Sequence, residues 1–145
     1  MQTAIIYCSQ HHGNTKKLLD AIAQEGGVDL MEASASPEVD LAAYDLIGFA
    51  SGIYCSKLHS AVTACAARNL PRGKKIFVVY TYGLWKPDLR DLEQIAREKG
   101  AQILGVYGCR GFSDYGPLKL LGGIAKGRPN AQDIAGAVAF YRELR

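Results

Sequence analysis

The sequence predicts an α/β domain with a doubly wound sheet of five parallel strands and helices on both faces. Two observations favour this fold class. Short apolar runs alternate with segments of helical periodicity, and the runs lack the apolar-polar alternation of a sheet with one solvated face. With 145 residues, the chain is long enough to bury a core, and we expect one domain over residues 1–145.

Each expected strand corresponds to one apolar run. These runs are Ala4–Cys8, Val28–Met31, Leu46–Ala50, Ile76–Thr81 and Gln102–Tyr107. Between them, apolar residues three or four positions apart predict one face of a helix. The four helical stripes are Leu18, Leu19, Ile22 and Ala23; Leu58, Val62, Cys65 and Ala66; Leu89, Leu92, Ile95 and Ala96; and Ile134, Val138 and Tyr141.

Helix boundaries are marked by glycine, proline and capping residues. The first three helices are expected to end at Gly26-Gly27, Pro71-Arg72-Gly73 and Gly100. Asn130, with Asp133 three residues later, predicts the start of the last helix. The connection Glu32–Tyr44 contains Pro37 and predicts only a short helix.

Composition excludes several function classes. The formal net charge is +3 and the basic residues are scattered, so we expect no nucleic-acid binding. The four cysteines have no Cys-x-x-Cys spacing, which favours reduced thiols. The N-terminus lacks a charged segment followed by a long apolar run, so we expect a cytoplasmic protein without a membrane span. We also expect no metal site, because His59 is the only histidine outside the first loop and no acidic cluster accompanies it.

The first strand runs into a polar loop that opens directly onto a helix, which is how a chain forms an anion site. The loop residues are Ser9, Gln10, His11, His12, Gly13, Asn14 and Thr15. They match neither the Gly-x-Gly-x-x-Gly dinucleotide pattern, nor a Walker loop, nor a Cys-x5-Arg phosphatase loop, nor the acidic cluster of a receiver domain. A single phosphate monoester fits this loop; the alternative is that Ser9, Asn14 and Thr15 cap the helix.

Two further loops are expected at the same sheet edge, after the third and fourth strands. Ser51, Gly52, Ile53 and Tyr54 belong to the segment Ser51–Lys57, and Thr81, Tyr82, Gly83, Leu84 and Trp85 to Thr81–Pro87. Small residues beside apolar and aromatic ones suit a flat ring. A ring lying near a phosphate site predicts FMN, with Tyr54, Tyr82 or Trp85 stacking on the ring.

These three segments resemble the flavodoxin family. The most specific part is His12-Gly13-Asn14-Thr15, which is similar to the family's Thr-Gly-Asn-Thr phosphate loop. The resemblance covers essentially the whole chain and implies a sheet of order 2-1-3-4-5 that binds FMN non-covalently and moves one or two electrons. The chain differs from the family in its Gly83-Leu84-Trp85-Lys86 segment, which lacks an acidic Gly-Asp, and in being mildly basic where many carrier flavodoxins are strongly acidic.

The segment Cys109–Pro129 is too long for a routine connection, and such segments are usually functional or mobile. It contains several glycines and the basic residues Arg110, Lys119, Lys126 and Arg128. This pattern indicates either a cover for the flavin or a docking surface for an acidic partner or a nucleotide. The alternative is a surface loop packed by Phe112, Tyr115 and Leu118.

Three functions are compatible with these features. The first is a flavodoxin-like redox protein that exchanges electrons with a redox partner protein through FMN, with no catalytic side chain of its own. The second is an NAD(P)H-dependent FMN or quinone reductase, in which the long basic segment binds the nucleotide. The third is a flavin-free scaffold domain that retains only the architecture.

Overall fold

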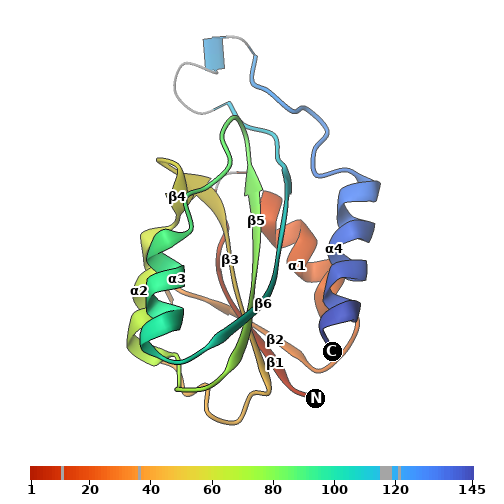
Figure 1. Cartoon of the computed structure of the whole chain (residues 1–145). Helices are drawn as coiled ribbons and strands as arrows, with labels where there is room; N and C mark the ends of the chain where they lie inside the picture. The colour runs from red at the N-terminus through yellow and green to blue at the C-terminus, as the bar shows by residue number, and fades with distance from the viewer. Residues whose placement is uncertain (11, 36, 115–118, 121) are drawn as a thin grey trace.

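The computed structural model describes residues 1–10, 12–35, 37–114, 119–120 and 122–145, and its centre is a parallel sheet of order β2-β1-β3-β5-β6 (Figure 1). Its strands are β1 (Thr3–Cys8), β2 (Val28–Glu32), β3 (Leu46–Tyr54), β5 (Lys75–Tyr82) and β6 (Gln102–Arg110). The two-residue strand β4 (Lys57–Leu58) pairs antiparallel with the end of β3. The doubly wound α/β fold and the expected order of five parallel strands are confirmed; β4 is an addition.

In the part of the chain that the structure describes, four helices cover the two faces of the sheet (Figure 1). These are α1 (Asn14–Ala23), α2 (Ser60–Asn69), α3 (Arg90–Glu98) and α4 (Ala131–Leu144). Helices α1 and α4 pack on one face around Phe77 and Tyr141, while α2 and α3 pack on the other around Phe49. Burial on both faces explains why the strands read as continuous apolar runs.

Strand pairing extends β3, β5 and β6 beyond their expected ends. Strand β3 was expected to end at Ala50, but Gly52 pairs with Thr81 of β5, and Ile53 then pairs back to Leu58 of β4. The prediction that Ser51–Lys57 is wholly a loop is therefore wrong, as is the assignment of Leu58 to a helix. Likewise Thr81-Tyr82 belong to β5 and Cys109-Arg110 to β6, because Tyr82 pairs with Arg110. Hydrogen bonds to a neighbouring strand, rather than local composition, set these ends.

The connection Glu32–Tyr44 forms turns in the residues that the structure describes there, so the expected short helix is wrong. The Asn69 side chain supplies the reason. Its amide nitrogen donates to the carbonyl of Pro37 at 2.8 Å, and its oxygen accepts from the N–H of Val39 at 3.3 Å. These contacts satisfy backbone groups that a helix would otherwise pair internally.

The last helix begins as predicted. The Asn130 side chain accepts from the N–H of Asp133 at 2.9 Å, and the Asp133 carboxylate accepts from the N–H of Asn130 at 2.8 Å. This reciprocal capping box fixes the start of α4. Further along the helix, the Tyr141 hydroxyl is hydrogen-bonded at 2.7 Å to the Thr3 hydroxyl of β1, which anchors α4 to the sheet.

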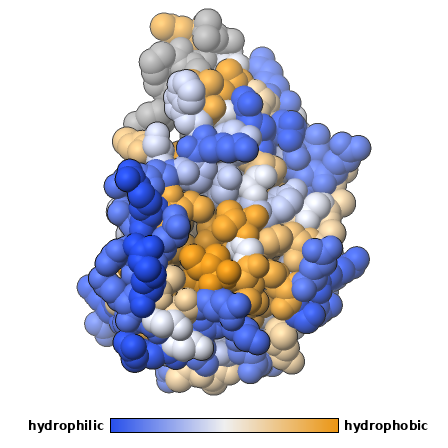
Figure 2. Space-filling model, in the orientation of Figure 1, coloured by the Kyte–Doolittle hydropathy of each residue, from blue (hydrophilic) through white to orange (hydrophobic). Residues whose placement is uncertain are grey.

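Strand β6 forms one edge of the sheet and leaves part of its apolar surface accessible. Figure 2 shows hydrophobic surface in the middle of the face where β6 runs between α3 and α4 in Figure 1. Val106 of β6 is 45% exposed, consistent with this view. Within the described residues, no helix has the length and apolar character needed to cross a membrane.

Candidate functional site

The loop between β1 and α1 presents backbone N–H groups at the start of the helix. Gly13 is the N-cap residue with φ 64°, and His12 also has a positive φ of 57°, a backbone conformation that reverses the chain tightly. The Ser9 hydroxyl accepts from the N–H of Lys16 at 3.1 Å. Among the described residues, nothing accepts from the N–H groups of Asn14 and Thr15, so both are available to an anion.

The side chains of Asn14 and Thr15 bind neighbouring segments and do not cap the helix. The Asn14 amide nitrogen donates to the carbonyl of Phe112 at 2.8 Å. The Thr15 and Thr81 hydroxyls are hydrogen-bonded at 2.8 Å, and both residues are buried. The capping alternative therefore holds for Ser9 alone. The other two residues connect the loop to the segment after β6 and to the end of β5.

A cavity of about 610 Å³ opens where β3, β5 and β6 end. We call it the ring cavity. It is lined by Gln10, Asn14, Gly52, Ile53, Tyr54, Cys55, Ser56, Thr81, Tyr82, Gly83, Leu84, Trp85, Gly111, Phe112 and Ser113. Its lining combines aromatic and aliphatic side chains with a few polar groups, which is the composition of sites that bind flat organic ligands.

The aromatic residues of the ring cavity lie in different environments. Trp85 is 69% exposed at the rim, and the Tyr82 ring lies 5.5 Å from the Arg110 guanidinium. Tyr54 packs edge-on against His59, with ring centroids 5.1 Å apart. The Tyr54 hydroxyl is buried, and no described group is hydrogen-bonded to it. An unpaired buried hydroxyl is costly, and the described residues leave this one unsatisfied.

The rim of the ring cavity beside Tyr54 is a tight turn. Cys55 and Ser56 have φ values of 48° and 64°, and two consecutive positive φ values reverse β3 into β4. Ser51, at the base of this hairpin, is fully buried and accepts from the N–H of His59 at 3.0 Å. Ser51 therefore holds the hairpin in place from beneath.

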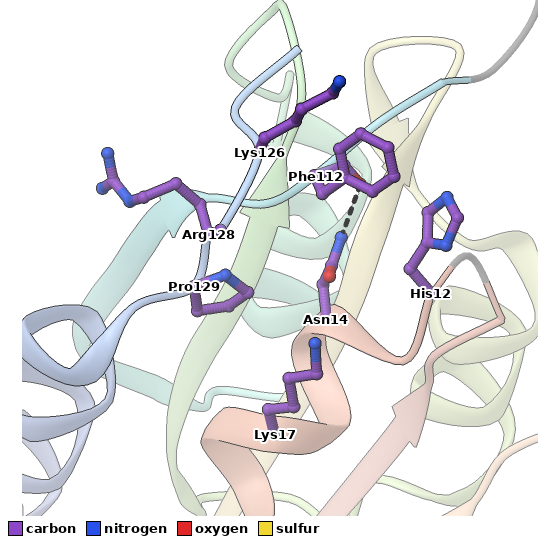
Figure 3. Close-up of a pocket in the computed structure, with 8 residues that line it drawn as sticks. His12, Asn14, Lys17, Phe112, Lys126, Arg128 and Pro129 are labelled. Carbon is purple, nitrogen blue, oxygen red and sulfur yellow. Dashed lines mark hydrogen bonds between the residues drawn. The ribbon is translucent and has the colours of Figure 1, made fainter. Parts of the chain in front are cut away.

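A second cavity of about 500 Å³ lies beside the start of α1 (Figure 3). We call it the basic cavity. It is lined by His12, Asn14, Lys17, Phe112, Lys126, Gly127, Arg128 and Pro129. Asn14 and Phe112 line both cavities, so they form the wall between them.

The expected site residues divide among these features. Gln10, Asn14, Gly52, Ile53, Tyr54, Thr81, Tyr82, Gly83, Leu84 and Trp85 line the ring cavity, and His12 and Asn14 line the basic cavity. Among the described residues, Ser9, Gly13, Thr15 and Ser51 line neither cavity. His11 lies outside the described residues, as do Tyr115 and Leu118.

The sequence did not identify Gly111, Phe112 and Ser113, which complete the ring cavity. They follow β6 directly, in the long segment singled out for its length and glycine content. The tight approach of Gly111 to Asn14 explains the glycine there, because an added Cβ would lie 2.7 Å from the Asn14 amide nitrogen. The prediction that this segment covers the flavin is compatible with this placement.

Cysteines near the site differ in reactivity. Burial, with a smaller effect of the nearby Asp133 carboxylate, raises the pKa of Cys109 to about 12. That thiol is therefore protonated at neutral pH and unreactive. Cys55 is exposed at the rim of the ring cavity.

Comparisons with known proteins agree with this architecture. A flavodoxin domain family model matches residues 4–98. An uncharacterised protein of Methanocaldococcus jannaschii is 36% identical over 99% of this chain and 98% of its own length. Two solved structures share the fold: an oxidised Flavodoxin 2 from Bacillus cereus (TM-score 0.67, 20% identity, 100% of both chains) and a flavodoxin from the domain Archaea (TM-score 0.67, 16% identity, 99% of this chain and 96% of the other). By the family model and the Methanocaldococcus relative, the chain belongs to the flavodoxin domain family.

Proposed function

We propose that this protein binds FMN non-covalently and transfers electrons through it, as a flavodoxin-like redox protein. The observation that carries the proposal is the ring cavity of about 610 Å³ at the carboxyl ends of β3, β5 and β6, beside the start of α1. Ligands of doubly wound sheets bind at this edge. The flavin supplies the redox chemistry when bound, while the chain supplies orientation and polarity.

The residues present fit this cofactor. Tyr54, Tyr82 and Trp85 offer aromatic surface for a flat ring, and the unpaired Tyr54 hydroxyl offers a hydrogen bond to a ring heteroatom. The N–H groups of Asn14 and Thr15 offer hydrogen bonds to a phosphate, and the dipole of α1 favours negative charge there.

Titration of the folded, flavin-free protein with FMN tests the proposal. We expect saturable one-to-one binding that quenches flavin fluorescence. Tyr54→Phe removes only the unpaired hydroxyl and should weaken binding about fivefold, from about 1 kcal/mol for one hydrogen bond. Tyr44→Phe is the matched control, because the Tyr44 hydroxyl donates to Asp29 and lies outside both cavities.

Absence of FMN binding to the folded chain would leave the flavin-free scaffold as the function. If Tyr54→Phe binds FMN as tightly as the unchanged protein does, the Tyr54 hydroxyl does not contact FMN, but the proposal that the protein binds FMN still holds. The two results separate the cofactor from the role of one residue.

The second candidate is an NAD(P)H-dependent reductase. The basic cavity favours it, because a cationic space directly beside the ring cavity suits a phosphorylated reductant. Rapid mixing of the FMN-loaded protein with NADPH distinguishes the two functions. Fast bleaching of the flavin indicates a reductase, and no bleaching without a partner protein indicates an electron carrier.

A further inference from the structure

The basic cavity holds more positive charge than one phosphate at the start of α1 requires. Four of its lining residues are basic or titratable: His12, Lys17, Lys126 and Arg128. Two of them have carboxylate partners. His12 Nε2 lies 2.8 Å from Asp114, and Arg128 binds Asp133 through both carboxylate oxygens at 2.6 and 2.7 Å.

Lys17 and Lys126 have no carboxylate partner among the described residues. Figure 3 shows Lys17 extending from α1 toward Asn14, with Lys126 on the opposite side of the cavity. Both residues line the basic cavity, and neither lines the ring cavity. Two uncompensated positive charges therefore flank a hollow that lies outside the space for the flavin ring.

Asn14 supplies an independent sign of a ligand. The residue is only 7% exposed, and its amide nitrogen is used by the carbonyl of Phe112. Its amide oxygen is buried, and no described group donates to it. Asn14 lines both cavities, so this oxygen is an unused acceptor in the wall between them.

We propose that the basic cavity binds a second nucleotide phosphate, with the adjoining ribose hydroxyl donating to Asn14 Oδ1. Lys17 and Lys126 would bind the phosphate as point charges. We assign the FMN phosphate to the N–H groups of Asn14 and Thr15, so a phosphate bound by Lys17 and Lys126 would be a second group, supplied by a larger or a second ligand.

Two ligands carry a phosphate of this kind. One is a flavin dinucleotide, whose second phosphate follows the first directly. The other is a nicotinamide nucleotide with a 2′-phosphate, bound with or without a flavin in the ring cavity. The flavin dinucleotide alternative rests on the proposed function, whereas the nicotinamide nucleotide alternative does not depend on it.

Calorimetry with pairs of probes tests the proposal. The flavin-free protein is titrated with FMN and FAD, and both the flavin-free and FMN-loaded proteins are titrated with NADP⁺ and NAD⁺. We expect at least a tenfold preference within one pair, for FAD over FMN or for NADP⁺ over NAD⁺. The pair that shows the preference identifies the source of the phosphate.

The variant Lys17→Gln/Lys126→Gln removes both unpaired charges and should abolish the preference. The control Lys16→Gln/Lys119→Gln removes the same charge without touching either cavity, since Lys16 pairs with Asp20 at 2.6 Å and Lys119 lines neither cavity. It should retain the preference.

A preference of less than twofold in both pairs overturns the proposal, and so does a preference that survives Lys17→Gln/Lys126→Gln. If no flavin binds, the proposed function fails, while the NADP⁺ and NAD⁺ titrations of the flavin-free protein still decide whether the cavity takes a phosphate.

Discussion

Thr15 and Thr81 form a buried hydroxyl pair that joins the start of α1 to the end of β5. The two oxygens lie 2.8 Å apart, and the residues are 1% and 3% exposed. Thr15→Val keeps the shape of the side chain and removes one hydroxyl, which leaves the Thr81 hydroxyl buried without a partner. Such a group costs about 1–3 kcal/mol, so we expect the free energy of unfolding to fall by that amount.

Thr15→Val/Thr81→Val should be closer in stability to the unchanged protein than either single variant is, because replacing both partners leaves no unsatisfied group. Urea unfolding followed by far-ultraviolet circular dichroism measures the cycle. With a slope of about 2 kcal/mol per molar urea, a loss of about 2 kcal/mol moves the midpoint by about 1 M. Thr63→Val is the control, since the Thr63 hydroxyl bonds only within its own helix, to the carbonyl of Ser60. A double variant destabilised by the full sum of the singles would refute the reasoning.

Two further predictions concern titration and reactivity. The Arg128 guanidinium lowers the pKa of Asp133, so the stabilisation from this carboxylate is fully present above its unfolded pKa of about 3.9 and is lost as the pH falls from there through the lower folded pKa. Asp133→Asn should therefore cost about 1–2 kcal/mol at pH 7 in urea unfolding and less at pH 3; an equal cost at both would contradict the linkage. In thiol labelling at pH 8, the exposed Cys55 should react quickly, and Cys109, whose pKa is raised by burial, should react slowly. Because Cys55 lines the ring cavity, saturating FMN should slow its labelling. An unchanged labelling rate of Cys55 would mean that FMN binds elsewhere.

The fold was predictable because burial dominates it. The run Ile76–Thr81 lies between two layers of helices, so its apolar continuity alone indicates a central parallel strand. The start of α4 could also be predicted from Asn130 and Asp133, because both residues of a capping box lie within one turn of the helix. Both predictions used interactions that the sequence displays directly.

The hairpin after β3 was not predictable in the same way. Cys55 and Ser56 adopt positive φ values without glycine or asparagine, so the sequence carries no turn signal there. Leu58 follows this turn and is buried as a helix stripe residue would be, yet its backbone pairs with Ile53. Only pairing with the neighbouring strand β3 decides whether Leu58 belongs to a helix or to a strand.

In the candidate site, too, some residues could be predicted from local sequence and others are placed by tertiary contacts. Gln10, Asn14 and the aromatic residues of the ring cavity follow from their places after strands. Phe112 and Lys126 reach the start of α1 from about 100 residues away, through the path of the segment between β6 and α4. That path is set by tertiary contacts such as the Asn14 bond to the Phe112 carbonyl, which no local pattern encodes.

The anchoring of α4 to β1 through Tyr141 and Thr3 has a practical consequence. It holds the last helix beside the first strand, so both chain ends emerge at the pole of the molecule opposite the loops that form the cavities (Figure 1). An affinity tag, a fusion domain or an electrode linker attached at either end would leave the cavity mouths open to solvent. Immobilised protein should therefore exchange small molecules as freely as protein in solution.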